Sequence, residues 1–168
     1  IMYADGSTGV VYIDPDEDIL KEADEKLRLQ KEDDLKLSAF IGKPTVTKDG
    51  RKIMMFANIT RPSDIDAVLE NDAEGIGLFR SEFMYMDRRT LPTEDELYSV
   101  YSSIAEKMGN KPVIIRTLDI GADKKADCIP MENEENPAPG LRAIRLRLKR
   151  PDIFKSQLRA IYRASVKP

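Results

Sequence analysis

Two stretches of the sequence are the most informative: residues 75–83 read GIGLFRSEF, and residues 114–124 read IIRTLDIGADK. Each begins as a short apolar run and reaches an arginine, Arg80 or Arg116, next to turn-forming residues. Short apolar runs bounded by turn residues are typical of strands in a parallel sheet. A strand that delivers an arginine to its carboxyl end is one way to build an anion site in an α/β protein.

The rest of the second half predicts alternating strands and helices. Strands are expected at residues 53–59, 75–79 and 112–117, and helices at residues 62–71, 92–108, 140–149 and 152–164. The first strand shows no alternation of apolar and polar residues, which suits a strand buried on both faces. Because strand and helix alternate, the sheet is expected to be parallel. About three βα units are present, whereas closure needs roughly eight strands, so we predict an incomplete (β/α)8 TIM-type barrel.

Three segments are expected along the chain. Residues 1–13 read as a turn and a short strand, too little for a domain and similar to the end of a preceding module. Residues 14–42 form a charged helical linker that Asp14 and Pro15 open. Residues 43–168 hold the barrel portion. Since the chain begins with Ile1, we expect a piece of a longer protein.

Composition narrows the possible functions. Of 168 residues, 34% are charged and 41% hydrophobic, and the net charge is -3, so a soluble protein without general affinity for nucleic acid or membranes is expected. Cys128 is the single cysteine, which fits a reducing, cytoplasmic location. The sequence contains no histidine, so any imidazole chemistry must come from elsewhere.

Four cations are expected to gather at one rim of the sheet. The carboxyl ends of neighbouring parallel strands meet, which would place Arg80 beside Arg116. Lys124 lies on the loop that follows, and Arg142 lies at an expected helix N-terminus. Guanidinium groups bind carboxylate and phosphate bidentately, so this set suits a small anion that carries both.

A less specific interpretation also applies, because most arginines lie at the surface in weak ion pairs. That interpretation is favoured for the polar side of the helix at 140–149, namely Arg145, Arg147, Lys149 and Arg150. Glu82 and Asp119 are expected to hold the neighbouring arginines rather than to act as bases or metal ligands.

At these loops the sequence resembles the phosphoenolpyruvate-protein phosphotransferases, enzyme I of the bacterial sugar phosphotransferase system. The matching segments are residues 5–9, 75–88, 91–96, 116–124, 135–137, 140, 142–145 and 157–161. The resemblance implies a parent with a swivelling phosphohistidine domain, a helical domain that docks the carrier protein HPr, and a C-terminal (β/α)8 barrel that binds phosphoenolpyruvate and Mg²⁺. Residues 1–13 would be the C-terminal remnant of the phosphohistidine domain.

By this resemblance, Arg80, Arg116, Lys124 and Arg142 match the cations that bind phosphoenolpyruvate. The phosphorylated histidine, the Mg²⁺ ligands and the catalytic cysteine of the family would lie outside this chain. The parent would be a homodimeric, kinase-like transferase serving sugar transport, and the chain alone is expected to be inactive. Ser81 departs from the usual threonine of the family.

Two alternatives stay open. The parent could be a related enzyme, pyruvate phosphate dikinase or phosphoenolpyruvate synthase. The chain could also be a non-catalytic interaction fragment in which the cations are structural. In addition, an open partial barrel has free sheet edges, so we expect self-association through the first or third barrel strand.

Overall fold

The computed structural model describes residues 1–121, 126–132, 134–136 and 138–166. The chain divides into two compact units, Ile1–Lys43 and Pro44–Pro168. Among the described residues, no helix has both the length and the apolar character needed to cross a membrane.

The first unit is a hairpin followed by a helix. Strands β1 (Met2–Asp5) and β2 (Val10–Ile13) pair antiparallel, and α1 spans Glu17–Ser38. The Asp5 carboxylate accepts a hydrogen bond from Ser7 N (2.9 Å) and pairs with Lys26 Nζ (3.1 Å), so it joins the hairpin turn to the helix. Hydrogen bonds from the Ser7 hydroxyl and from Lys26 hold the pKa of Asp5 well below its usual range.

The start of α1 differs from the prediction. Its N-cap is Asp16, whose Oδ1 accepts a hydrogen bond from Ile19 N at 2.9 Å, and not Asp14. Asp14 instead has a positive φ of 47° and pairs with the amino group of Ile1 at 2.8 Å. The carboxylate two residues later therefore satisfies the exposed N–H groups of the first turn.

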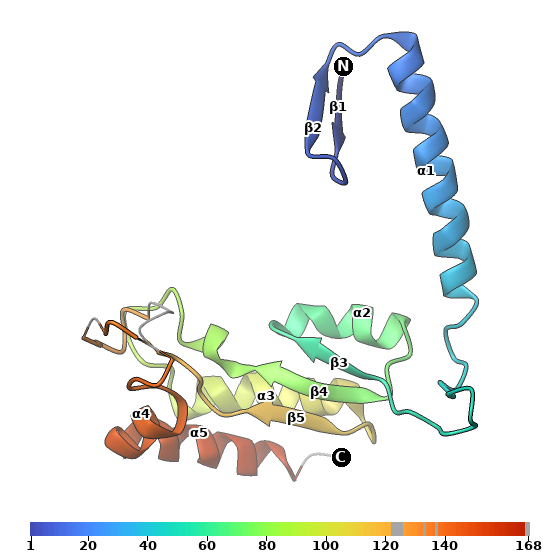
Figure 1. Ribbon diagram of the computed structural model, residues 1–168. Coiled ribbons are helices and arrows are strands. Elements are labelled where there is room, and N and C mark those ends of the chain that lie inside the picture. Colours follow the sequence, from blue (N-terminus) through green and yellow to red (C-terminus); the bar gives the residue numbers. More distant parts are fainter. Residues whose placement is uncertain (122–125, 133, 137, 167–168) are drawn as a thin grey trace. The chain divides into compact units, whose positions relative to one another are not determined.

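The second unit is an α/β structure, as predicted (Figure 1). Its parallel sheet has the order β3-β4-β5, formed by β3 (Phe56–Ile59), β4 (Gly75–Arg80) and β5 (Val113–Arg116). The helical elements are η1 (Pro62–Asp64), α2 (Ile65–Glu70), η2 (Ser81–Met84), α3 (Glu94–Met108), α4 (Ala143–Lys149) and α5 (Pro151–Ala164). The helix expected from residue 140 begins only at Ala143, because Arg142 is extended and forms its N-cap.

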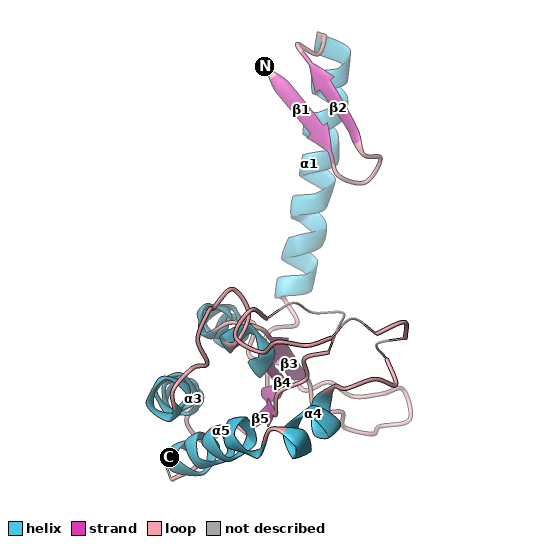
Figure 2. Cartoon of the chain, turned by 90° about the vertical axis from the view of Figure 1, so that its left-hand side faces the viewer, coloured by secondary structure: helices cyan, strands magenta, loops and turns pink. Residues whose placement is uncertain are grey.

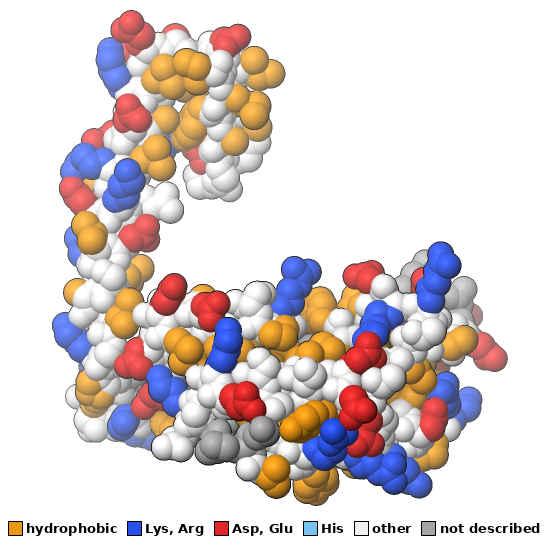
Figure 3. Space-filling model, turned by 180° about the vertical axis from the view of Figure 1, so that it is seen from behind, with side chains coloured by type: hydrophobic (Ala, Val, Ile, Leu, Met, Phe, Trp, Pro, Cys, Tyr) orange, Lys and Arg blue, Asp and Glu red, His pale blue; other side chains and the backbone are white. Residues whose placement is uncertain are grey.

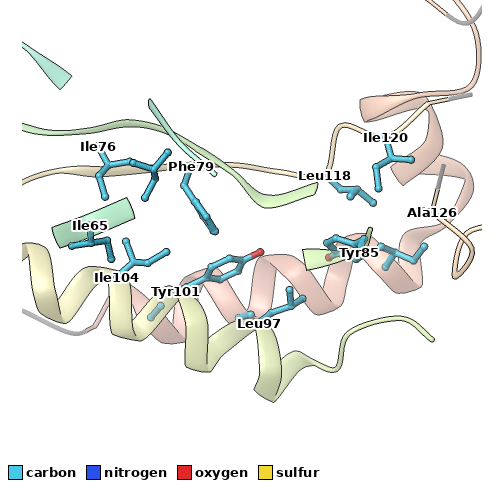
Figure 4. Packing of buried hydrophobic residues seen from close by; sticks show 14 of the residues in the cluster. Ile65, Ile76, Phe79, Tyr85, Leu97, Tyr101, Ile104, Leu118, Ile120 and Ala126 are labelled. Carbon is cyan, nitrogen blue, oxygen red and sulfur yellow. The ribbon is translucent and has the colours of Figure 1, made fainter. Parts of the chain in front are cut away.

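The core lies on one side of the sheet, where α3 and α5 pack (Figure 2). Phe79 of β4 and Tyr101 of α3 are fully buried and meet edge to face, with 6.1 Å between ring centroids. Residues from β4, α2, α3 and the segment after β5 surround them (Figure 4); those labelled include Ile65, Ile76, Leu97, Ile104, Leu118 and Ile120. This packing fixes the carboxyl ends of β4 and β5 against the helices.

The other face of the sheet is covered less, and the prediction for residues 53–59 is wrong here. The strand begins only at Phe56, so Met54 and Met55, which are 58% and 53% exposed, precede it. Phe56 is itself 37% exposed, because α3 and α5 pack on the opposite side of the described sheet. Phe56 lies close to Gly77: a Cβ atom added at Gly77 would lie only 2.9 Å from the Cβ atom of Phe56. The glycines of residues 75–83 therefore allow close packing, as the sequence indicated.

Candidate anion-binding site

Arg80 and Arg116 end neighbouring strands. They are register partners in the parallel pair β4–β5, which confirms that they lie side by side at the carboxyl rim of the sheet. Both are half-buried. Within the described ranges, the Arg80 side chain has no hydrogen bond or ion pair with another residue.

Arg116 is held by two carboxylates. Its Nη2 donates to Glu82 Oε1, and its Nη1 lies 3.3 Å from Asp119 Oδ2. The Glu82 side chain is 1% exposed, so this carboxylate depends on charged partners for compensation. The expectation that Glu82 and Asp119 hold the arginine in place is confirmed. Arg116 Nε is buried and has no hydrogen-bond partner among the described residues.

Asp119 also reaches Arg142, the N-cap residue of α4. Asp119 Oδ1 accepts from Arg142 Nη2 at 3.2 Å and from its Nε at 3.3 Å. One carboxylate thus joins the arginine at the end of β5 to the arginine at the start of α4. Lys124, the fourth expected cation, lies outside the described residues.

Arg147 does not fit the expectation of a solvated surface residue. It is half-buried, stacks over the Phe154 ring with 4.9 Å between Cζ and the ring centroid, and donates to Thr117 Oγ1 and Ala143 O. Burial lowers the pKa of this guanidinium, and the field of Asp119 opposes that shift. Helix periodicity alone did not reveal it, because Thr117 is distant in sequence. Arg145 and Lys149 are exposed, as expected.

Sequence analysis also missed the residue that connects these strand ends, Gln157 of α5. Its side chain is fully buried. Oε1 accepts from Leu118 N at 2.8 Å, and Nε2 donates to Ser81 Oγ at 2.9 Å and to Tyr101 OH at 3.1 Å. A sequence signal exists, because Gln157 interrupts the apolar stripe of α5 formed by Ile153, Ala160 and Ala164.

The charges of the cluster do not cancel. In the described part of the chain, the guanidinium groups of Arg116, Arg142 and Arg147 lie near the carboxylates of Glu82 and Asp119, and Arg80 is the register neighbour of Arg116. An excess of two positive charges therefore remains among these six side chains. By contrast, side chains of both signs are interspersed on the molecular surface seen from behind (Figure 3). Because the whole chain has a net charge of -3, the positive charge of these six side chains is a local feature and not a property of the whole chain.

Carboxylate oxygens are common ligands of Mg²⁺, so Glu82 and Asp119 are the candidates for a metal site in this cluster. In the part of the chain that the structure describes, no group of three or more His, Cys, Asp or Glu side chains could hold a metal ion. Glu82 and Asp119 both direct carboxylate oxygens at arginines. These two carboxylates, which are engaged by arginines, therefore do not fit a Mg²⁺ site.

Comparison with known proteins agrees with the geometry. Residues 35–168 match the family model of the PEP-utilising enzyme, PEP-binding domain. The chain is 45% identical over 161 residues to the phosphoenolpyruvate-protein phosphotransferase of Bacillus subtilis (strain 168), and 46% identical over 162 residues to that of Staphylococcus carnosus (strain TM300). Each alignment covers 96% of this chain and 28% of the relative.

The enzyme of Latilactobacillus sakei is 44% identical over 165 residues, which is 98% of this chain and 29% of the relative. The chain thus spans less than a third of the length of these curated relatives. The family model, by contrast, covers most of the chain, including every strand of the parallel sheet. The chain therefore belongs to the PEP-utilising enzymes, and its residues 35–168 lie within their PEP-binding domain.

Proposed function

We propose that the rim formed by the ends of β4 and β5 binds phosphoenolpyruvate. The register pairing of Arg80 with Arg116 supports this proposal most directly, because it brings two guanidinium groups to one edge. A phosphate monoester carries a charge of about -1.5 to -2 at neutral pH, and the carboxylate adds another. The formal charge of +2 that these six side chains carry has the sign that such an anion requires.

The residues would have different tasks. Arg80, with no described partner, would take ligand oxygens directly and bidentately. Arg116 is oriented by Glu82 and Asp119, so little reorganisation is needed when a ligand approaches. Arg142 and Lys124 would complete the set. Together they would hold the phosphoryl oxygens and stabilise charge that develops during transfer.

For the whole protein, the proposed activity is that of a phosphoenolpyruvate-protein phosphotransferase. The phosphoryl group would pass from phosphoenolpyruvate to a histidine and then to HPr, in support of sugar transport in the cytoplasm. This chain has no histidine, so it would supply substrate binding and would be inactive alone. The sequence identity of 44–46% to phosphoenolpyruvate-protein phosphotransferases favours this activity over that of pyruvate phosphate dikinase or phosphoenolpyruvate synthase.

In that parent, the described sheet would form part of a (β/α)8 barrel, and residues 1–13 would end the phosphohistidine domain. The three parallel strands and their connecting helices are compatible with the beginning of such a barrel. Mg²⁺ would be held by ligands outside this chain, and the parent would be a homodimer.

Amide and arginine side-chain signals in ¹⁵N-resolved NMR spectra test the proposal. Phosphoenolpyruvate should shift signals of Arg80, Arg116 and Arg142 saturably, whereas pyruvate and inorganic phosphate, each with one of the two anionic groups, should bind more weakly. Equal weak shifts for all three compounds, or none at millimolar concentration, would favour the non-catalytic interaction fragment.

A further inference from the structure

We infer that Gln157 is a positioning residue for the anion site: its amide fixes the segments that follow Arg80 and Arg116 relative to each other. This inference rests on the proposed function. Gln157 does not contact either guanidinium in the described structure. It acts on the backbone that carries them.

The contacts of the amide reach both strand ends. Oε1 accepts from the N–H of Leu118, two residues after Arg116, at 2.8 Å. Nε2 donates to the hydroxyl of Ser81, the residue after Arg80, at 2.9 Å. A single side chain from α5 is thus bonded to the segments after β4 and after β5, which lie 76 and 39 positions away from it.

Ser81 closes the connection. Its Oγ accepts from Gln157 Nε2 and donates to the carbonyl oxygen of Arg116 at 2.5 Å. Ser81 is fully buried, so these bonds are protected from competition by water. The peptide groups on either side of Thr117 are therefore both held, one through Arg116 O and one through Leu118 N.

The surroundings of Gln157 indicate that its polarity has a purpose beyond packing. The other buried positions of α5, Ile153, Ala160 and Ala164, are apolar. Burying an amide costs free energy unless its polar groups are hydrogen-bonded. If the position only had to fill space, an apolar side chain would do so without this cost. Each polar atom of Gln157 instead has a partner at a site loop or on α3.

Gln157→Met tests the inference, because methionine has similar length but no amide. Tyr101→Phe is the matched control: it removes the second partner of Nε2, at 3.1 Å, and leaves the bonds of the Gln157 amide to Ser81 and Leu118 in place. The first readout needs no ligand and is the Nε–Hε NMR signal of Arg116. The second is the dissociation constant for phosphoenolpyruvate.

Gln157→Met is expected to shift and broaden the Arg116 signal and to weaken binding roughly tenfold or more, since small misplacements of binding groups are costly. Tyr101→Phe should lower stability but leave the signal and the affinity nearly unchanged. A folded Gln157→Met protein with the unmodified Arg116 signal would overturn the inference. If this variant does not fold, Ser81→Ala replaces it, because that change removes the hydrogen bond to Arg116 O. An unmodified Arg116 Nε–Hε signal in Ser81→Ala would then overturn the inference.

The two proposals fail in different ways. If the unmodified chain does not bind phosphoenolpyruvate, the proposed function fails, and the Arg116 signal still reports whether Gln157 positions the strand end. If the chain binds and both variants behave alike in both readouts, the positioning role fails while the proposed function stands.

Discussion

Asp119 and Arg142, which are 23 positions apart in the sequence, form an ion pair with 3.2 Å between Oδ1 and Nη2. The second oxygen of Asp119 lies 3.3 Å from Arg116 Nη1. Both partners of the Arg142 pair are only 21% exposed, so the pair is screened less than one at the surface. Asp119 therefore holds Arg116 and Arg142 near each other. Its single negative charge balances only one of their two positive charges.

Asp119→Asn should show this role in stability. Neutralising the carboxylate weakens its bonds to Arg116 and Arg142, and we expect a loss of about 1–2 kcal/mol in the free energy of unfolding. Asp152→Asn is the control, because Asp152 pairs with Arg150 at 2.7 Å but is 57% exposed, and should change stability by about 0.5 kcal/mol or less. Urea denaturation measures both. Equal losses would contradict the role given to Asp119.

The glycine-rich strand β4 offers a test of the packing. A Cβ added at Gly75 would lie 2.7 Å from the carbonyl oxygen of Pro112 on the next segment of the sheet. Gly75→Ala should therefore destabilise the protein by about 1–3 kcal/mol, since backbone must move. Ser103→Ala, on the exposed side of α3, is the control. A thermal midpoint for Gly75→Ala equal to that of the control would contradict the close approach.

The turn after β3 should respond to pH. Asp64 Oδ2 accepts from Thr60 N and Arg61 N, both at 2.9 Å, and these bonds lower its pKa below the ordinary 3.8. A carboxyl whose pKa is lower in the folded state stabilises the protein above its unfolded pKa, and this stabilisation disappears as pH falls through the folded value. Asp64 should thus contribute at pH 6 and lose its contribution in acid.

The measurement is the stability difference between the unmodified chain and Asp64→Asn, followed by urea denaturation from pH 6 downward. The difference should shrink below about pH 4, because the unmodified side chain then becomes protonated. Asp66→Asn, an exposed carboxylate of α2 that pairs with Lys107, is the matched control. A difference for Asp64→Asn that stays constant down to pH 3 would show that its hydrogen bonds do not favour the ionised form.

Self-association is expected through the outer strands of the described sheet, β3 and β5. Ile114 of β5 is 52% exposed and Phe56 of β3 is 37% exposed, so the edges carry apolar side chains. Sedimentation velocity should show dimers that increase with protein concentration, and Ile114→Lys should shift the population toward monomer. A single monomeric species at every concentration would refute this prediction.

Much of the fold follows from local sequence patterns. The strand ending at Arg80 was predictable because apolar residues and a closing turn coincide. Helix α3 was predictable because Pro92 and Thr93 precede apolar residues that recur on one helix face, and the structure adds a capping box between Thr93 and Glu96. The burial of residues 53–59 was not predictable, since a continuous apolar run does not say how many faces of the sheet are covered. Asp14 and Asp16 are both of the residue type favoured at N-caps and are both followed by acidic residues, so the sequence could not choose between them.

The site also contains residues that the sequence could predict and residues that it could not. The neighbouring arginines follow from parallel topology, and acids near them in sequence, such as Glu82 and Asp119, are natural partners. Gln157 and Arg147 act on residues 30 to 76 positions away, through side-chain contacts that exist only after α4 and α5 have packed. No periodicity specifies such pairs. The polar interruption at Gln157 was the available hint.

Isothermal titration of phosphoenolpyruvate into the unmodified chain, Arg80→Met and Arg159→Met tests the central claim most directly. Arg159 is exposed on α5 and controls for loss of a positive charge. We predict saturable binding that Arg80→Met weakens about tenfold to a hundredfold, as expected for lost hydrogen bonds to a charged group, while Arg159→Met leaves it unchanged. Absence of binding, or equal affinities for all three proteins, would contradict a phosphoenolpyruvate site at the ends of β4 and β5.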